Sequence, residues 1–107
     1  MTEKRKDPRV GFDASAEVKF SSWAAFYEVY TENISRGGMM LQMSRAPKLG
    51  DVVEIKLHPP NGEKITLRGE VKFVAEPKGL RYGVGVEFIE LDEGKIAMIE
   101  KIIDDAI

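Results

Sequence analysis

Apolar and polar residues alternate one by one along much of this 107-residue chain. The pattern is clearest at 16–20, 53–57 and 82–88, and the stretches 25–31, 39–43 and 65–74 also read as strands. Side chains of a strand point alternately to its two faces, so this spacing predicts strands with one buried face. Short strands separated by regular turns predict a closed or nearly closed antiparallel barrel. Gly69, inside 65–74, indicates a bulge or a sharp bend of the barrel wall.

The hydrophobic period changes after residue 91. Asp92 is a candidate helix N-cap, and it precedes one apolar helix face made of Ile96, Ile99, Ile102, Ile103 and Ala106. We therefore expect one mainly all-β domain over residues 1–107. It would have a basic N-terminal arm at 1–11, a barrel at 14–90 and a C-terminal helix at 92–106 that packs over the barrel.

The composition excludes several classes of protein. The chain has no cysteine, which rules out disulfides, thiolate nucleophiles and cysteine-based metal sites. It has no apolar run near the roughly 18 residues of a membrane span and no secretory signal, so we expect a cytoplasmic protein without membrane insertion. A net charge of −2 argues against binding of DNA or RNA by the surface as a whole.

The first of two short motifs lies in the basic arm. Arg5 and Arg9 are four residues apart, so in an extended arm they project the same way. Guanidinium groups stay charged at physiological pH and form forked hydrogen bonds to phosphate or to the O6 and N7 atoms of guanine. The alternative is an ordinary solvated N-terminus.

The second motif, Asn33-Ile34-Ser35-Arg36-Gly37-Gly38, falls between two strand-like stretches. Asn33 and Ser35 offer an amide and a hydroxyl, which suit a guanine edge or a ribose. Gly37 and Gly38 leave room for a ligand to reach the backbone N–H groups. The alternative is a turn in which Asn33 and Ser35 bond to their own backbone and the glycines supply a positive φ.

Taken together, Arg-x-x-x-Arg before the first strand and Asn-x-Ser-x-x-Gly after the second resemble the PilZ domain family. The segments 69–74 and 82–88 look like late strands of that family, so the resemblance covers nearly the whole chain. It implies a six-stranded antiparallel PilZ-type barrel with a C-terminal helix.

The resemblance further implies a receptor for cyclic di-GMP, a bacterial second messenger with two guanines and two phosphodiesters. Arg5 and Arg9 would hold guanine and phosphate, Asn33 and Ser35 would make the polar contacts, and Gly38 would be the glycine of close approach. Asn33 stands where the family allows Asp or Asn, and its neutral carbonyl predicts somewhat weaker binding. The ligand would order the arm, and a partner protein would read the new surface.

Four further residues are weaker candidates for contact with the ligand. Lys4 and Lys6 flank Arg5, where a basic residue can favour a stacked pair of ligands in this family, and Gly37 adjoins Gly38. Phe73 stands where the family often has an aromatic residue that stacks on guanine, although packing in the core is the alternative that we prefer for it.

Other readings of the chain are kept as alternatives. The main one is a PilZ-like protein-interaction scaffold that binds no nucleotide, and another is a barrel that binds single-stranded nucleic acid. Trp23 belongs to the core or to a partner surface. His58 is the only histidine, so we expect no metal site, and no residues pair as a catalytic acid and base. An enzyme is the least favoured class.

Overall fold

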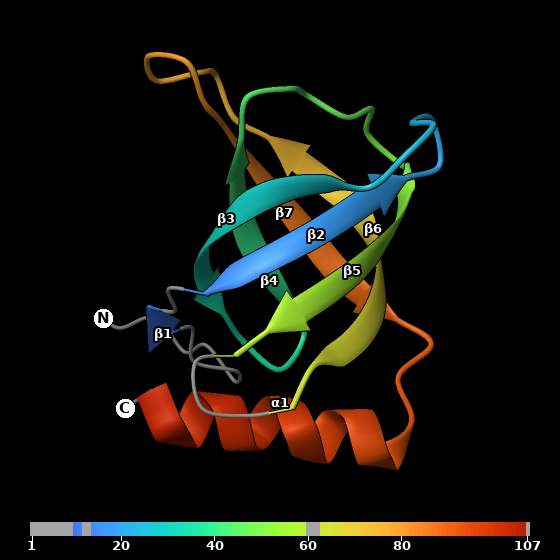
Figure 1. The fold of residues 1–107 in the computed structure, drawn as a ribbon, viewed down its shortest axis with the longest axis vertical. Coiled ribbons are helices and arrows are strands. Elements are labelled where there is room, and N and C mark those ends of the chain that lie inside the picture. Colours follow the sequence, from blue (N-terminus) through green and yellow to red (C-terminus); the bar gives the residue numbers. More distant parts are fainter. Residues whose placement is uncertain (1–9, 12–13, 60–62, 107) are drawn as a thin grey trace, which may run out of the picture.

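The computed structural model describes residues 10–11, 14–59 and 63–106. Within these residues the chain forms seven strands and one helix (Figure 1). In chain order they are β1 (Val10–Gly11), β2 (Ser15–Phe20), β3 (Tyr27–Ile34), β4 (Gly38–Met43), β5 (Val52–His58), β6 (Ile65–Val74), β7 (Tyr82–Ile89) and α1 (Glu93–Ala106).

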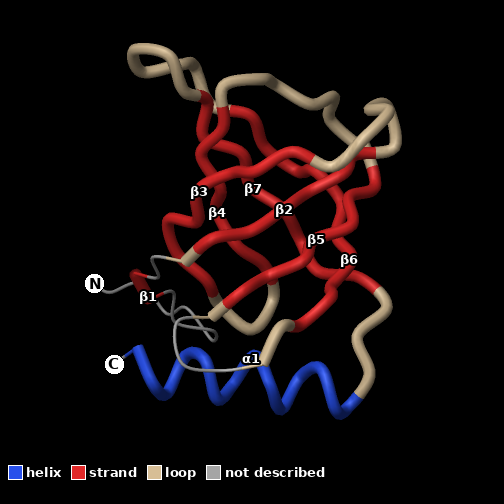
Figure 2. The backbone as a smooth tube through the Cα atoms, viewed as in Figure 1, coloured by secondary structure: helices blue, strands red, loops and turns tan. Residues whose placement is uncertain are grey.

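The strands form one antiparallel sheet that closes on itself. Neighbours pair in the order β3-β2-β5-β6-β7-β4, and a further pairing between β3 and β4 joins the two ends of that series. Figure 2 shows the closed wall of strands with α1 lying across one end. The short β1 is an additional strand that pairs with β3, on the same edge as β2. The predicted six-stranded antiparallel barrel with a C-terminal helix is confirmed.

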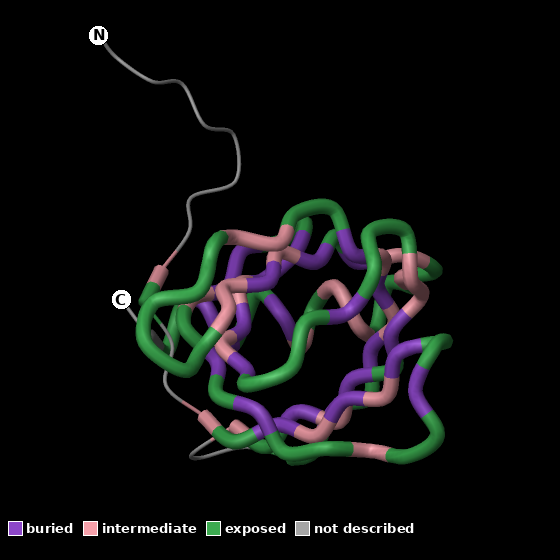
Figure 3. The backbone as a smooth tube through the Cα atoms, turned by 90° about the horizontal axis from the view of Figure 1, so that it is seen from above, coloured by how far each residue is buried: buried purple, intermediate pink, exposed green. Residues whose placement is uncertain are grey.

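The core lies inside the barrel wall. Buried and more exposed residues alternate along the strands, as the period-two pattern predicted (Figure 3). Phe20, Leu41, Ile55 and Leu67 are fully buried, and each such side chain contributes about 1.5–3 kcal/mol through burial. Trp23 also belongs to the core, because it is 5% exposed.

The second predicted strand differs in its bounds. β3 begins at Tyr27 and not at Ala25, and it runs on through polar residues to Ile34. Its start is delayed because Trp23 turns into the core, where its amide donates to the carbonyl O of Phe20 at 2.8 Å. Its end is extended because β4 and β1 both pair with the last residues of β3.

The helix α1 begins where the sequence predicts. The Lys95 amide donates to Oδ1 of Asp92 at 2.8 Å, so Asp92 is the N-cap. Ile99, Ile102 and Ile103 are buried and belong to the same core cluster as the strands. The helix thus closes one end of the barrel with its apolar face.

A bulge predicted near Gly69 lies three residues further along β6. The pairing of β6 with β7 shifts between Val71 and Phe73, so Lys72 is the extra residue. Gly69 itself stays paired and allows close approach, since a Cβ there would lie 2.9 Å from the carbonyl O of Glu87. The absence of a side chain at Gly69 therefore allows β6 and β7 to pack closely.

At the barrel end away from α1, one carboxylate joins two turns. Asp51 accepts hydrogen bonds from Ser22 Oγ at 2.6 Å, Ser21 Oγ at 3.1 Å and the Lys48 amide at 3.1 Å. Burial alone would raise the pKa of Asp51, but the hydrogen bonds from Ser22, the Lys48 amide and Ser21 outweigh it and lower that pKa. Asp51 therefore favours its ionised form in the folded protein.

Candidate ligand-binding site

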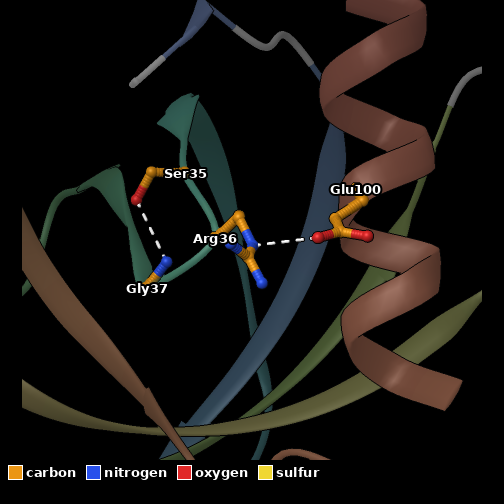
Figure 4. A network of polar contacts seen from close by, with 4 residues as sticks. All are labelled: Ser35, Arg36, Gly37 and Glu100. Atoms are coloured by element: carbon orange, nitrogen blue, oxygen red, sulfur yellow. Dashed lines mark hydrogen bonds and ion pairs between the residues drawn. The ribbon is translucent and has the colours of Figure 1, made fainter. Parts of the chain in front are cut away.

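The polar motif at 33–38 forms the turn between β3 and β4. The amide of the buried Ser35 donates to the carbonyl O of Gly38 at 2.8 Å. Its Oγ accepts from the Gly37 amide at 3.3 Å (Figure 4). The same Oγ donates to the Gly38 carbonyl O at 3.4 Å. The alternative in which Ser35 bonds to its own turn is thus correct. The positive φ expected of the two motif glycines is not found there, and among the described glycines it occurs at Gly50 and Gly79.

The two motif glycines have different surroundings. A Cβ at Gly38 would overlap the carbonyl O of Val86 in β7, whereas a Cβ at Gly37 would meet nothing within 4 Å. Beside this contact the Phe88 amide donates to the Gly37 carbonyl O at 2.8 Å. Gly38 therefore lets β4 and β7 close the barrel, and Gly37 leaves open space beside the turn.

Arg36 connects this turn with the C-terminal helix. Its Nε lies 3.0 Å from Oε2 of Glu100 in α1 (Figure 4). The two side chains are 53% and 47% exposed, and an ion pair of that exposure contributes at most about 1 kcal/mol to stability. The pair is thus a positional link between the turn and α1 more than a source of stability.

A cross-strand row of side chains extends from Asn33 over the outer face of the barrel. Asn33 pairs with Met40, Met40 with Gly85, and Gly85 with Phe73. Paired residues share one face of a sheet. Because Gly85 has no side chain, Met40 and Phe73 close over it: a Cβ there would lie 3.2 Å from Met40 Sδ and 3.3 Å from Phe73 Cβ. The row brings an amide, a thioether and a phenyl ring together.

Two bulges determine which side chains end this row. In β3 the pairing with β4 shifts between Thr31 and Asn33, so Thr31 stays buried while Glu32, the extra residue, is exposed beside Asn33. In β6 the extra residue Lys72 has the same effect on Phe73, which is 53% exposed. The preferred expectation that Phe73 packs in the core is therefore wrong. Both bulges lie next to the candidate site, where bulges commonly re-aim side chains.

The first described strand ends at the same place. β1 pairs with the end of β3, and Gly11 lies opposite Asn33. Thr31 holds Ala14, the residue just before β2, because its hydroxyl donates to the Ala14 carbonyl O at 3.0 Å and accepts from the Ala14 amide at 2.7 Å. β1 therefore joins the barrel beside the second motif.

The predicted arm residues Lys4, Arg5, Lys6 and Arg9 lie outside the residues that the structure describes. Of the other predicted site residues, Asn33, Ser35, Gly37 and Gly38 form one continuous segment, and Phe73 ends the row that starts at Asn33.

A family model described as the PilZ domain matches residues 3–105, a span that includes both motifs. The chain belongs to the PilZ domain family. No curated protein matches it.

Solved structures agree with this PilZ fold. The PilZ domain with c-di-GMP of YcgR from Escherichia coli has a TM-score of 0.83 at 12% identity, covering 97% of this chain and 92% of that one. The PilZ domain of CeSA from a cellulose synthesizing bacterium has a TM-score of 0.69 at 19% identity, covering 92% and 96%. The inhibitor of motility MotI from Bacillus subtilis has a TM-score of 0.79 at 15% identity. That match covers 97% of this chain and 51% of MotI, so this chain spans about half the length of MotI.

Other chemistry is sparse in the described part of this PilZ domain. No group of three His, Cys, Asp or Glu residues there could hold a metal ion, and His58 is exposed at the end of β5. No helix within the described ranges has the length and apolar character needed to cross a membrane. The sequence did not identify Met40 and Gly85 as part of the site, because only the strand pairing places them between Asn33 and Phe73.

Proposed function

We propose that this PilZ domain is a receptor for cyclic di-GMP in the bacterial cytoplasm and that it has no enzymatic activity. The observation that carries the proposal is the pairing of Gly11 with Asn33. Arg9 is two residues ahead of Gly11 in the chain, so the pairing tethers the arginine motif to the second motif. This supports the proposal, since the two motifs that the family resemblance assigns to ligand binding would then share one part of the surface.

The residue chemistry fits a ligand with guanine bases and phosphodiesters. Arg5 and Arg9 would bind phosphate and the O6 and N7 atoms of a guanine. Asn33 would accept from guanine N–H groups, with Ser35 and Gly38 supplying the polar turn beneath it. Ser35 is bonded within its own turn, so its hydroxyl would keep that turn in shape or exchange a partner when the ligand binds.

Four residues would make secondary contacts. Phe73 has an exposed ring at the end of the cross-strand row, and a base stacked on such a ring gains about 1–3 kcal/mol. Gly37 has open space beside the turn. Lys4 and Lys6 would add positive charge close to the phosphates. One ligand or a stacked pair would fit these contacts.

The signal would pass to a partner protein, with no DNA or RNA involved. Ligand held between the arm and the Ser35–Gly38 turn would form a new surface on this side of the barrel. The Arg36–Glu100 ion pair connects the same turn to α1, so the partner protein would contact the arm and the helix together.

Isothermal titration calorimetry with cyclic di-GMP tests the proposal, with cyclic di-AMP as the ligand control. Selective, saturable heat is expected, and its stoichiometry distinguishes one ligand from a stacked pair. Arg5→Ala should weaken binding at least about tenfold without changing the melting temperature. Arg45→Ala is the matched control, because Arg45 stacks on Trp23 at 4.4 Å, near the start of β3 and away from Asn33 at its other end. The absence of heat with the wild-type protein for either dinucleotide, together with an unchanged melting temperature, would refute the receptor and favour an interaction scaffold.

A further inference from the structure

A small hollow adjoins the cross-strand row on the outer face of the barrel. Its volume is about 220 Å³. Pockets for whole drug-sized ligands measure about 300–1,000 Å³, so this hollow has room for one ring system and not for a complete dinucleotide. It is lined by Glu32, Met40, Gln42, Ala75, Glu76, Lys78, Arg81 and Gly83.

The half-buried side of the hollow carries Gln42 and two apolar side chains, Met40 and Ala75. Gln42 of β4 pairs with Gly83 of β7. A Cβ at Gly83 would lie 3.6 Å from both Met40 Cε and Ala75 Cβ. Because Gly83 has no side chain, the backbone of β7 is exposed between a thioether and a methyl group. Such a surface suits the face of an aromatic ring, since methionine sulfur contacts aromatic rings favourably.

The rim of the hollow carries hydrogen-bond donors at a fixed place. The Arg81 guanidinium stacks over the Tyr30 ring, 4.1 Å from its centroid. Lys78 and Arg81 face each other across the β6–β7 hairpin, where the Lys78 amide donates to the Arg81 carbonyl O at 2.8 Å. Stacking on Tyr30 holds the guanidinium by its face and leaves its N–H edge available for a planar acceptor.

Carboxylate acceptors line the same hollow. Glu32 is the extra residue of the β3 bulge, and Glu76 precedes the hairpin turn. Guanine presents the acceptors O6 and N7 along one edge and the donors N1–H and N2–H₂ along another. Arg81 matches the first edge, and a carboxylate matches the second. Adenine has an amino donor in place of O6 and a lone pair at N1, so it would oppose both groups.

We propose that this hollow binds a guanine base, the second base of the cyclic dinucleotide whose first base is held by the arm and Asn33. The inference rests on the proposed function and extends it. Met40 connects the two places, because it pairs with Asn33 and also lines the hollow. Arg81 and Glu32 would then determine base specificity at a position outside both sequence motifs.

The test uses cyclic di-GMP and the hybrid cyclic dinucleotide that has one guanine and one adenine. A forked arginine–guanine contact corresponds to about 5- to 150-fold in affinity. The wild-type protein should therefore bind the hybrid that much more weakly than cyclic di-GMP. Arg81→Ala should weaken cyclic di-GMP binding by a similar factor and bring the two affinities together, and Glu32→Gln should also reduce the difference.

Arg45→Ala is the control. Arg45 likewise stacks on a tyrosine, since its guanidinium lies 5.4 Å from the centroid of the Tyr27 ring, but it does not line the hollow. It should keep the wild-type affinities and their ratio. If Arg81→Ala behaves as Arg45→Ala does while Arg5→Ala weakens binding at least about tenfold, the hollow is not a guanine subsite and the receptor stands. If the wild-type protein binds neither dinucleotide, both proposals are wrong.

Discussion

Replacement of Gly38 by alanine tests whether this motif residue is needed for the barrel itself. The new Cβ would overlap the carbonyl O of Val86, and β7 would have to move until the two atoms are at least 3.0 Å apart. That movement would lengthen the 2.8 Å hydrogen bond from the Phe88 amide in β7 to the Gly37 carbonyl O. Overpacking costs about 1–3 kcal/mol and a weakened hydrogen bond about 0.5–1.5 kcal/mol.

We therefore expect Gly38→Ala to lower the free energy of unfolding by about 3 kcal/mol and, at about 4 °C per kcal/mol, the melting temperature by about 10 °C or more. Gly37→Ala is the matched control. Its Cβ meets nothing within 4 Å and its φ is not positive, so its melting temperature should stay within about 3 °C of wild type. Differential scanning calorimetry measures both. Equal melting temperatures for the two variants would refute the assignment of Gly38 to barrel closure.

Four further substitutions separate structural roles from functional ones. Phe73→Ala should leave the free energy of urea unfolding nearly unchanged, because the ring is 53% exposed. It should weaken cyclic di-GMP binding about 5- to 150-fold. Phe20→Ala, at a fully buried position, should instead cost about 3–5 kcal/mol of stability. Ile99→Ala should cost about 2–5 kcal/mol in the same assay, since Ile99 is fully buried between α1 and the barrel, and a loss below about 1 kcal/mol would contradict that packing. Asp51→Asn should be less stable than wild type at pH 7. The folded-state pKa of Asp51 lies below its ordinary value of 3.8. The contribution of Asp51 to the free energy of unfolding is therefore fully present above about pH 4 and is lost as the pH falls through the folded-state pKa. A stability difference between the variant and wild type that is the same at pH 7 and pH 2 would contradict the role of its hydrogen bonds.

The strands and the helix could be predicted from the sequence because each has one buried face. The alternation at 53–57 and 82–88 and the N-cap at Asp92 are local signals, and the structure agrees with them. Phe73 shows where such reasoning fails. Strict alternation from the buried Val71 puts Phe73 inside, but the extra residue Lys72 reverses the order and exposes the ring. The residue type at position 72, a lysine, does not predict a bulge.

The candidate site was predictable only in part for a similar reason. Asn33, Ser35 and Gly38 are close in sequence, so a motif reveals them. Met40 and Gly85 join the site through pairings between strands, and the sequence alone does not specify which strands pair. The structural role of Gly38 was hidden in the same way, because its close neighbour Val86 lies in another strand.

The Ser35–Gly38 turn depends on a part of the chain that is synthesised much later. β4 obtains one partner, β3, from the adjacent hairpin, whereas its other partner, β7, is the last strand. Pairings between distant segments form slowly, because a long loop must close before any contact compensates the lost entropy. The hydrogen bond from Phe88 to Gly37 exists only after that step. A partly folded chain would therefore lack the complete turn, and binding of a ligand there would report that the barrel has closed.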